Sequence, residues 1–290
     1  MLDYRLYTFL TLSKTLNYTK AADILCITQP AVSQHIRYLE TTYQVKLFEH
    51  QGKNLTLTRQ GEYLANCLHT MASDEKRIME TMQNIHEVKH LKFGATLTIG
   101  EYILPEKIHT FLKTHPNTNM TMIVENTANL LEMLEAGDIS FAIVEGYFPS
   151  HRYVHKSIST QPYVALKGSN YQTKQEIRCL KDLLSERLII REEGSGTREI
   201  LERILKENNL TIKDFSNAIE IGNMNAIKYL VQENMGITFL YEAAVEDELK
   251  KGTMQRIPLN DFHIQREFTF ITLKDTIFMD EYEEFLSSLL

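Results

Sequence analysis

The amino-acid sequence predicts an α/β protein that is preceded by a small all-α domain and a long helix. Three patterns predict this fold class: residues 1–58 contain short amphipathic helical segments, residues 59–90 contain one long helical segment, and apolar runs alternate with amphipathic helices from Leu91 onward. Such alternation is typical of βαβ units with largely parallel strands and right-handed crossovers. The 290 residues are enough for two or three domains with substantial cores.

The first 40 residues predict a pair of short helices packed on a first helix. Apolar residues recur at helical spacing in the first segment and would close a core beneath the pair; they are Leu2, Leu6, Phe9 and Leu10. The segment from Tyr18 has small and apolar residues that allow another helix to pack closely across it, namely Ala21, Ala22 and Leu25. The turn that follows has the length that a helix-turn-helix needs.

The third predicted helix begins near Gln29. Thr28 can cap it, and Pro30 is tolerated in its first turn because the missing amide would have had no intrahelical partner. Its inner side carries Val32, Ile36 and Leu39. Its outer side is polar and partly basic and suits a DNA major groove, where Gln and Arg pair with base edges; an ordinary solvated helix face is the alternative. We predict DNA contacts from Thr28, Gln29, Pro30, Ser33, Gln34 and Arg37.

A small β-wing is predicted after this helix. Gly52 and Asn54 supply turn chemistry before a short alternating strand, and Lys53 at the tip can reach a DNA phosphate. The charge distribution agrees, since residues 1–60 hold seven Lys or Arg against four Asp or Glu, whereas the rest of the chain holds 24 against 34. The overall charge of −7 therefore excludes a wholly basic nucleic-acid binder but leaves the N-terminal part as the surface that faces a polyanion.

A long helix follows, which Thr58 can cap and which is predicted to run to about Lys89. Apolar residues recur along it at near-heptad intervals, namely Leu64, Cys67, Met71, Ile78, Met82 and Ile85. At 1.5 Å per residue it spans roughly 45 Å, which is enough to separate two domains and to pair with a copy of itself. A helix buried within one globule is the alternative.

The end of this segment, His86-Glu87-Val88-Lys89-His90, fits the HExxH signature of zinc proteases. No HxxGxxH extension follows, and the motif directly precedes a predicted strand. A signature of this kind needs its own structural context, so we predict no catalytic residues, no metal and no cofactor.

The cysteines Cys26, Cys67 and Cys179 are far apart and form no CxxC pair, so neither a disulfide framework nor a cysteine zinc site is indicated. We interpret them as small buried apolar residues, with a redox role as the alternative. No apolar run is long enough to cross a bilayer, and the N-terminus lacks a signal-peptide pattern. We expect a cytoplasmic protein with no membrane partner.

The region from Leu91 onward predicts strands at 91–97, 120–125, 139–145, 163–167, 187–191, 217–221, 236–240 and 267–273, and helices at 100–114, 128–136, 197–208, 224–233, 242–250 and 279–289. This region is long for one doubly wound domain, so we expect two lobes. In open α/β sheets, ligands bind beyond the carboxyl ends of strands and beside helix N-termini.

Three segments place small polar residues at such junctions: Thr96–Gly100, Asn126–Thr127 and Gly194–Arg198. In the last, GSGTR, two glycines allow the backbone to approach a ligand; a turn that only caps a helix is the alternative. Glu145 is either structural or selects a ligand amine, and Arg198 either neutralises a carboxylate or pairs with Glu202. We predict ligand contacts from Thr96, Thr98, Asn126, Thr127, Ser195, Gly196, Thr197 and Asn223.

The strings TQPAVSQHIRYLE, KLFEH and LTLTRQG resemble the DNA-binding domain of the LysR-type transcriptional regulators, and later segments agree. The chain departs from many of these proteins at His50, where they have arginine. The resemblance implies a winged helix-turn-helix domain (1–58), a linker and dimerisation helix (59–90) and a two-lobed effector-binding domain resembling periplasmic binding proteins (91–290). It places lobe I at 91–161 and 267–290 and lobe II at 162–266.

The resemblance also implies a function. The protein would bind promoter DNA, respond to a small-molecule effector between the lobes, and form a homodimer through the linker helix and a homotetramer of two dimers, with RNA polymerase as a possible partner. The REEGSGTR segment resembles regulators of sulfur and carbon assimilation, which implies a small anion or metabolite acid as effector. A two-lobed solute-binding protein and a zinc hydrolase that uses HEVKH are the alternatives; we expect no enzyme.

Overall fold

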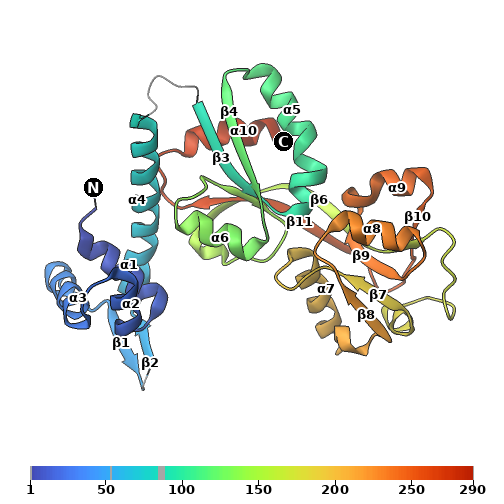
Figure 1. Cartoon of the computed structure of the whole chain (residues 1–290), viewed down its shortest axis with the longest axis horizontal. Coiled ribbons are helices and arrows are strands. Elements are labelled where there is room, and N and C mark those ends of the chain that lie inside the picture. The colour runs from blue at the N-terminus through green and yellow to red at the C-terminus, as the bar shows by residue number, and fades with distance from the viewer. Residues whose placement is uncertain (1, 53, 84–88, 290) are drawn as a thin grey trace.

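The computed structural model describes residues 2–52, 54–83 and 89–289. Figure 1 shows a small N-terminal domain beneath a long helix, a central α/β lobe beside that helix, and a second α/β lobe on the far side of the first. This arrangement confirms the predicted fold class. No helix in the described ranges is long and apolar enough to span a membrane.

The N-terminal domain contains three helices and a two-stranded antiparallel wing: α1 (Tyr4–Thr15), α2 (Tyr18–Leu25), α3 (Gln29–Tyr43), β1 (Phe48–Gln51) and β2 (Asn54–Leu57). Side-chain oxygens of Asp3, Asn17 and Thr28 cap the helices, as expected where short polar residues precede helical runs. The predicted inner residues Val32, Ile36 and Leu39 are buried, together with Phe9 and Leu12 of α1.

The linker helix α4 (Arg59–Gln83) begins where Thr58 accepts a hydrogen bond from the Gly61 amide (3.0 Å). It ends before the predicted limit near Lys89, because Lys89–Ala95 forms strand β3; residues 84–88 lie outside the described ranges. The predicted stripe residues Met71, Ile78 and Met82 are exposed on this single chain.

The remaining elements form two lobes around a mixed sheet of order β4-β3-β5-β11-β6-β9-β7-β8, with β10 paired to β6. Lobe I contains β3 (Lys89–Ala95), β4 (Thr118–Val124), β5 (Ala142–Val144), α5 (Leu104–Thr114), α6 (Thr127–Glu135) and α10 (Met279–Leu289). Lobe II contains β7 (Arg187–Ile190), β8 (Asn217–Glu220), β9 (Ile237–Tyr241), β10 (Met254–Arg256), α7 (Gly196–Glu207), α8 (Met224–Gln232) and α9 (Glu246–Lys251). Within each lobe, β3 pairs in parallel with β4 and β5, and β7 pairs in parallel with β8 and β9.

Two long antiparallel strands, β6 (Tyr153–Gly168) and β11 (Ile264–Leu273), connect the lobes. In lobe I, β11 pairs with β5, and in lobe II, β6 pairs with β9. The lobe boundaries implied by the resemblance, at 161/162 and 266/267, fall inside these two strands. These boundaries stay predictions.

Besides the end of α4, the strand predicted at 139–145 is shorter, Ala142–Val144, and three further elements differ more strongly from the prediction. Strand β6 begins at Tyr153, whereas the sequence predicted only 163–167. The helix predicted from 100 is divided into a π-helical turn (Ile99–Ile103) and α5, because Pro105 lacks the amide that would continue the first turn. The helix predicted at 242–250 is divided into a 3-10 turn (Glu242–Val245) and α9.

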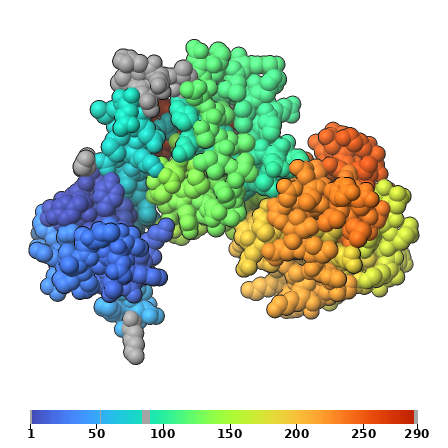
Figure 2. Space-filling view, viewed as in Figure 1, coloured from blue at the N-terminus to red at the C-terminus, as the bar shows by residue number. Residues whose placement is uncertain are grey.

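The linker helix packs against lobe I of its own chain. Gly137 lies so close to α4 that an added Cβ would be 2.8 Å from Ser73 Cα. The Thr70 hydroxyl donates to the Lys274 carbonyl (2.8 Å), and Arg77 forms an ion pair with Glu281 (2.6 Å). Figure 2 shows the N-terminal domain and lobe II on opposite sides of lobe I. These contacts join α4 to one lobe only.

Candidate DNA-binding surface and ligand cleft

Helix α3 presents its predicted polar side to solvent. Thr28, Gln29, Pro30, Gln34 and Arg37 are exposed, and Ser33 is half-buried. The side-chain amide of Gln29 donates a hydrogen bond to the Ser33 hydroxyl (3.0 Å). The Thr28 hydroxyl accepts a hydrogen bond from the backbone amide of Ala31 (3.3 Å). The structure therefore brings these residues together at the start and along one side of α3. Lys53, the predicted contact of the wing tip, lies outside the described residues.

The C-terminal half of α3 is held in place by contacts that were not predicted from the sequence. The Glu40 carboxylate accepts hydrogen bonds from Lys46 (2.7 Å) and from the Leu47 amide (2.9 Å). Partial burial raises the pKa of Glu40, but these hydrogen bonds outweigh it and the net pKa is lowered. On the other side, the Arg5 guanidinium stacks over the Tyr38 ring at 3.7 Å from its centroid. The orientation of α3 is thus tied to both α1 and the wing.

His90, the second histidine of HEVKH, lies in a strand and not on the helix that the zinc-protease signature needs. Lys89 and His90 both belong to strand β3, and His90 Nε2 lies 3.0 Å from the Thr121 hydroxyl. His86, Glu87 and Val88 lie outside the described ranges. Among the residues that the structure does describe, no three metal-ligating side chains come together.

The three cysteines are free thiols. Cys26 is exposed and lies at the left-handed C-cap of α2, so its interpretation as a buried residue was wrong. Cys67 and Cys179 are half-buried.

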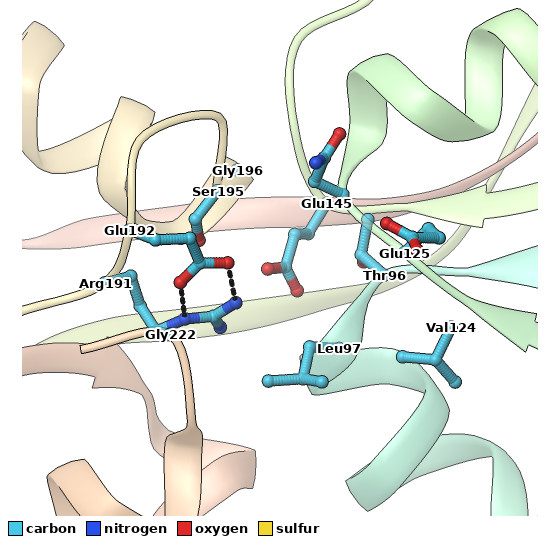
Figure 3. Close-up of a pocket in the computed structure, with 11 residues that line it drawn as sticks. Thr96, Leu97, Val124, Glu125, Glu145, Arg191, Glu192, Ser195, Gly196 and Gly222 are labelled. Carbon is cyan, nitrogen blue, oxygen red and sulfur yellow. Dashed lines mark hydrogen bonds and ion pairs between the residues drawn. The ribbon is translucent and has the colours of Figure 1, made fainter.

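A cavity of about 140 Å³ lies between the two lobes. It is lined by Thr96, Leu97, Val124, Glu125, Asn126, Glu145, Arg191, Glu192, Ser195, Gly196 and Gly222 (Figure 3). Most of the polar residues follow strands: Thr96 comes after β3, Glu145 after β5 and Arg191 after β7. The carboxyl ends of parallel strands from both lobes therefore meet at this cavity, as the general rule for α/β sheets predicts.

Glu145 is the central acidic group of the cavity and is buried. Its Oε1 accepts hydrogen bonds from the hydroxyls of Thr197 (2.7 Å) and Thr98 (3.3 Å), whereas its Oε2 has no hydrogen-bond partner. Burial raises the pKa of this carboxyl, against the two hydroxyls and the charge of Arg191. Because Thr98 belongs to lobe I and Thr197 to lobe II, Glu145 also holds the lobes together.

Arg191 is the cationic group of the cavity and is likewise buried. Its Nε and Nη2 donate to the two carboxylate oxygens of Glu192, each at 2.7 Å, and its Nη1 has no partner. The hydroxyls of Thr96 and Thr127 are also buried without a hydrogen bond. Buried polar groups are normally paired, so the three such atoms that belong to lining residues, in Thr96, Glu145 and Arg191, indicate a site that a polar ligand completes.

The predicted ligand contacts divide into three groups. Thr96, Asn126, Ser195 and Gly196 line the cavity. Thr98, Thr127 and Thr197 lie behind the lining, where Thr98 and Thr197 bind Glu145, and an added Cβ at Gly146 would be 2.6 Å from the Thr127 hydroxyl. Asn223 instead caps α8 by accepting from the Ala226 amide (2.9 Å), and its neighbour Gly222 lines the cavity.

Arg198 forms ion pairs with Glu202 (2.7 Å) and Glu220 (2.6 Å). Of the two alternatives that the sequence left open, the structure shows the pairing with Glu202.

Several residues that line the cavity were not predicted from the sequence, chiefly Glu125, Arg191, Glu192 and Gly222. Arg191 and Glu192 directly follow the apolar run of β7. The same rule that selected Thr96 and Asn126 would have selected these two residues, but the predicted segment began at Gly194.

Comparisons with known proteins agree over nearly the whole chain. Residues 86–289 match the family described as LysR substrate binding domain, and residues 4–62 match the bacterial regulatory helix-turn-helix protein, lysR family. The HTH-type transcriptional regulator CysL of Bacillus subtilis is 29% identical over 92% of this chain and 89% of its own length. A probable RuBisCO transcriptional regulator of Cyanidium caldarium is 27% identical over 88% of this chain and 83% of its own length.

Solved structures share the fold at lower identity. A full-length OxyR variant from Pseudomonas aeruginosa aligns over 100% of both chains with a TM-score of 0.61 and 20% identity. The regulatory domain of CcmR from Synechocystis, in complex with 2-PG, aligns over 69% of this chain and 97% of that domain with a TM-score of 0.61 and 18% identity.

Proposed function

The chain belongs to the LysR family of DNA-binding transcriptional regulators that respond to small molecules, and from this premise we propose which residues perform each task. The start and outer side of α3 read promoter DNA, and the cavity between the lobes binds the effector. The observation that carries the second assignment is the set of three buried, unpaired polar atoms on residues that line that cavity. Such a regulator acts at promoters, so its proposed location is the cytoplasm.

Gln29, Ser33, Gln34 and Arg37 are the proposed base-reading residues. They share one exposed side of α3, whose opposite side is anchored by Val32, Ile36 and Leu39. Arg and Gln side chains pair bidentately with guanine and adenine edges, respectively, in the major groove. Thr28, Pro30 and the first-turn amides lie at the N-terminus of α3, where a helix favours a phosphate.

The proposed dimer interface is the exposed apolar stripe of α4, Met71, Ile78 and Met82. These residues recur at intervals of seven and four, so they lie on one side of the helix. The contacts with lobe I use other positions of α4, among them Thr70, Asp74 and Arg77. The stripe is therefore available to a second copy. Two α3 helices would then enter successive major grooves of a two-fold DNA site, and two such dimers would form the tetramer.

The test of the DNA-reading assignment is fluorescence anisotropy with the fragment upstream of the protein's own gene and a scrambled fragment, each at low and physiological salt. Arg37→Ala is expected to weaken binding to the native fragment by about 1–3 kcal/mol while binding to the scrambled fragment changes little. Arg178→Ala is the matched control, since it removes an exposed arginine of lobe II whose guanidinium pairs with Glu176. Equal affinities of Arg37→Ala and the parent protein for the native fragment would disprove the assignment.

No observation favours the alternatives. The two-lobed body is shared with solute-binding proteins, but the family match at residues 4–62 adds a DNA-binding domain. The absence of catalytic activity stays a prediction, which zinc analysis and a casein digestion with purified protein would test.

A further inference from the structure

The charges and the unpaired atoms of the interlobe cavity specify a class of ligand. We propose that the effector is a small α-amino acid or a close analogue, whose ammonium group binds the Glu145 carboxylate and whose carboxylate binds Arg191 Nη1 and the first turn of α7. This inference rests on the proposed function of the cavity as the effector site.

The cavity volume limits the size of the ligand. Its volume of about 140 Å³ lies well below the roughly 300–1,000 Å³ of pockets that hold drug-sized molecules. A volume of this size favours a molecule with a few carbon atoms over a large ligand.

The charges of the residues that line the cavity disfavour the binding of a ligand that carries only negative charge. The lining residues include three carboxylates, Glu125, Glu145 and Glu192, and one cation, Arg191. That cation is already neutralised by its two hydrogen bonds to Glu192. Arg198, the next arginine along the chain, is engaged by Glu202 and Glu220. A ligand that carries only negative charge would therefore be repelled by the Glu125 and Glu192 carboxylates, whereas an ammonium group would be attracted to them. The same ammonium would stabilise the charged form of Glu145, whose pKa is otherwise raised by burial.

Glu145 provides the acceptor for that ammonium group. Its Oε1 is occupied by Thr98 and Thr197, which leaves Oε2 buried with no donor. The Thr96 hydroxyl, also without a partner, lines the same space. An ammonium has three N–H donors and can satisfy both oxygens at once. Charge-assisted hydrogen bonds of this kind are stronger than neutral ones, which makes Glu145 the largest single contribution to affinity.

Arg191 and α7 provide the donors for a carboxylate. Arg191 Nη1 is buried and unpaired. The side chain of Ser195, the N-cap of α7, makes no capping hydrogen bond, whereas Asn126 caps α6 and Asn223 caps α8. The first-turn amides of α7 therefore lack a side-chain acceptor, and a ligand carboxylate supplies one.

The two donor and acceptor groups face each other across the cleft. Figure 3 shows the Glu145 carboxylate and the Arg191 guanidinium extending into the same space from opposite lobes. An α-amino acid carries an ammonium and a carboxylate on one carbon, so one small ligand offers a partner to each of these two groups. A ligand that bridges Glu145 and Arg191 also holds lobe I against lobe II, which is the differential contact that a conformational response needs.

The test compares amino acids with matched analogues that lack one charge. Glycine, L-alanine, L-serine, L-cysteine and L-threonine are titrated into the full-length protein by calorimetry, beside glycolate, L-lactate, ethylamine and sulfate. At least one of the amino acids is expected to bind about 10- to 150-fold more tightly than the hydroxy acid that replaces its ammonium by hydroxyl, since a hydrogen-bonded charge is lost.

Variants of cavity residues test whether the ligand binds in the cavity. Glu145→Gln is expected to remove the preference for the ammonium group. Thr96→Val is expected to weaken binding without loss of folding, because valine is close to threonine in size and the Thr96 hydroxyl makes no hydrogen bond of normal geometry within the described structure. Glu207→Gln, at the exposed far end of α7, is the matched control. The inference is overturned if glycolate, lactate or sulfate binds as tightly as the amino acids, if none of the five amino acids binds, or if Glu145→Gln binds them unchanged.

The failure of this inference is distinguishable from the failure of the proposed function. Anions that bind the parent protein and lose affinity in Thr96→Val would overturn the ligand class and keep the cavity as the effector site. A ligand whose affinity is the same in Thr96→Val and Glu145→Gln as in the parent protein would overturn both. Promoter binding and its loss in Arg37→Ala do not depend on either result.

Discussion

The packing of the linker helix on lobe I predicts an unequal response to the same substitution at two glycines. Gly137 follows α6 with φ of +67°, and Gly252 follows α9 with φ of +70°. An added Cβ would lie 2.8 Å from Ser73 Cα at Gly137, whereas nothing lies within 4 Å at Gly252. Alanine therefore imposes backbone strain at both sites but a steric clash with α4 only at Gly137.

The two costs can be separated. Alanine in the left-handed region costs about 1 kcal/mol at either site. The contact at Gly137 falls well short of an ordinary carbon–carbon separation of about 3.5–4.0 Å, so α4 or the turn must move, and overpacking of this kind costs about 1–3 kcal/mol more. Gly252→Ala thus measures strain alone. The difference between the two variants measures the close approach of α4 to lobe I.

Hydrogen–deuterium exchange of α4 amides, together with thermal unfolding, tests this expectation. In Gly137→Ala the amides near Ser73 should exchange about 5- to 150-fold faster than in the parent protein, which corresponds to the 1–3 kcal/mol above. In Gly252→Ala the exchange of α4 should be unchanged. Equal stability losses and equal α4 exchange in the two variants would refute the packing of α4 against lobe I.

Three further predictions concern the ligand cavity, the α3 cap and the dimer stripe. Burial raises the folded-state pKa of Glu145, despite Thr197, Thr98 and Arg191, so its favourable contribution to folding is complete at low pH and is lost as pH rises through that raised value. Without ligand, the Tm of Glu145→Gln should therefore be higher than that of the parent protein at about pH 8, and the difference in Tm should become smaller toward about pH 5. A difference in Tm that does not change with pH would contradict this prediction. Thr28→Ala should destabilise the N-terminal domain by about 1 kcal/mol through the lost cap, measured by chemical denaturation, and an unchanged midpoint would show that the cap contributes nothing. Ile78→Glu should shift sedimentation toward monomer, whereas Glu207→Gln should not; a dimer of unchanged stability in Ile78→Glu would place the interface elsewhere.

The N-terminal domain could be predicted in detail because its signals are local. The Thr28 cap, Pro30 in the first turn and the spacing of Val32, Ile36 and Leu39 all act within one helix, and each recurs in the structure. Sequence patterns of this kind need no knowledge of distant partners.

The elements that were missed depend on distant partners. The first half of β6, from Tyr153, is polar and largely exposed and forms a strand because it pairs with β11 more than 100 residues later in the chain. Its sequence alone therefore lacks a strong strand signal. At the cavity, the rule for strand ends found Thr96 and Ser195, but which neighbours point inward depends on the closure of the two lobes. For this reason Asn223 was expected to line the cavity and Gly222 was not.

Lobe I is connected differently to the linker helix and to lobe II, and this difference bears on which part of the protein responds to a ligand. Lobe I is fastened to α4 through Thr70, Ser73 and Arg77, whereas lobe II is joined to it by β6 and β11. Lobe I is therefore in direct contact with the linker helix, and we expect lobe II to be the part that moves relative to both when a ligand closes the cleft. Lobe II lies on the side of lobe I away from the N-terminal domain (Figure 2). We therefore expect ligand binding to change the outer surface of lobe II first, where a neighbouring subunit in an assembly would respond to the change.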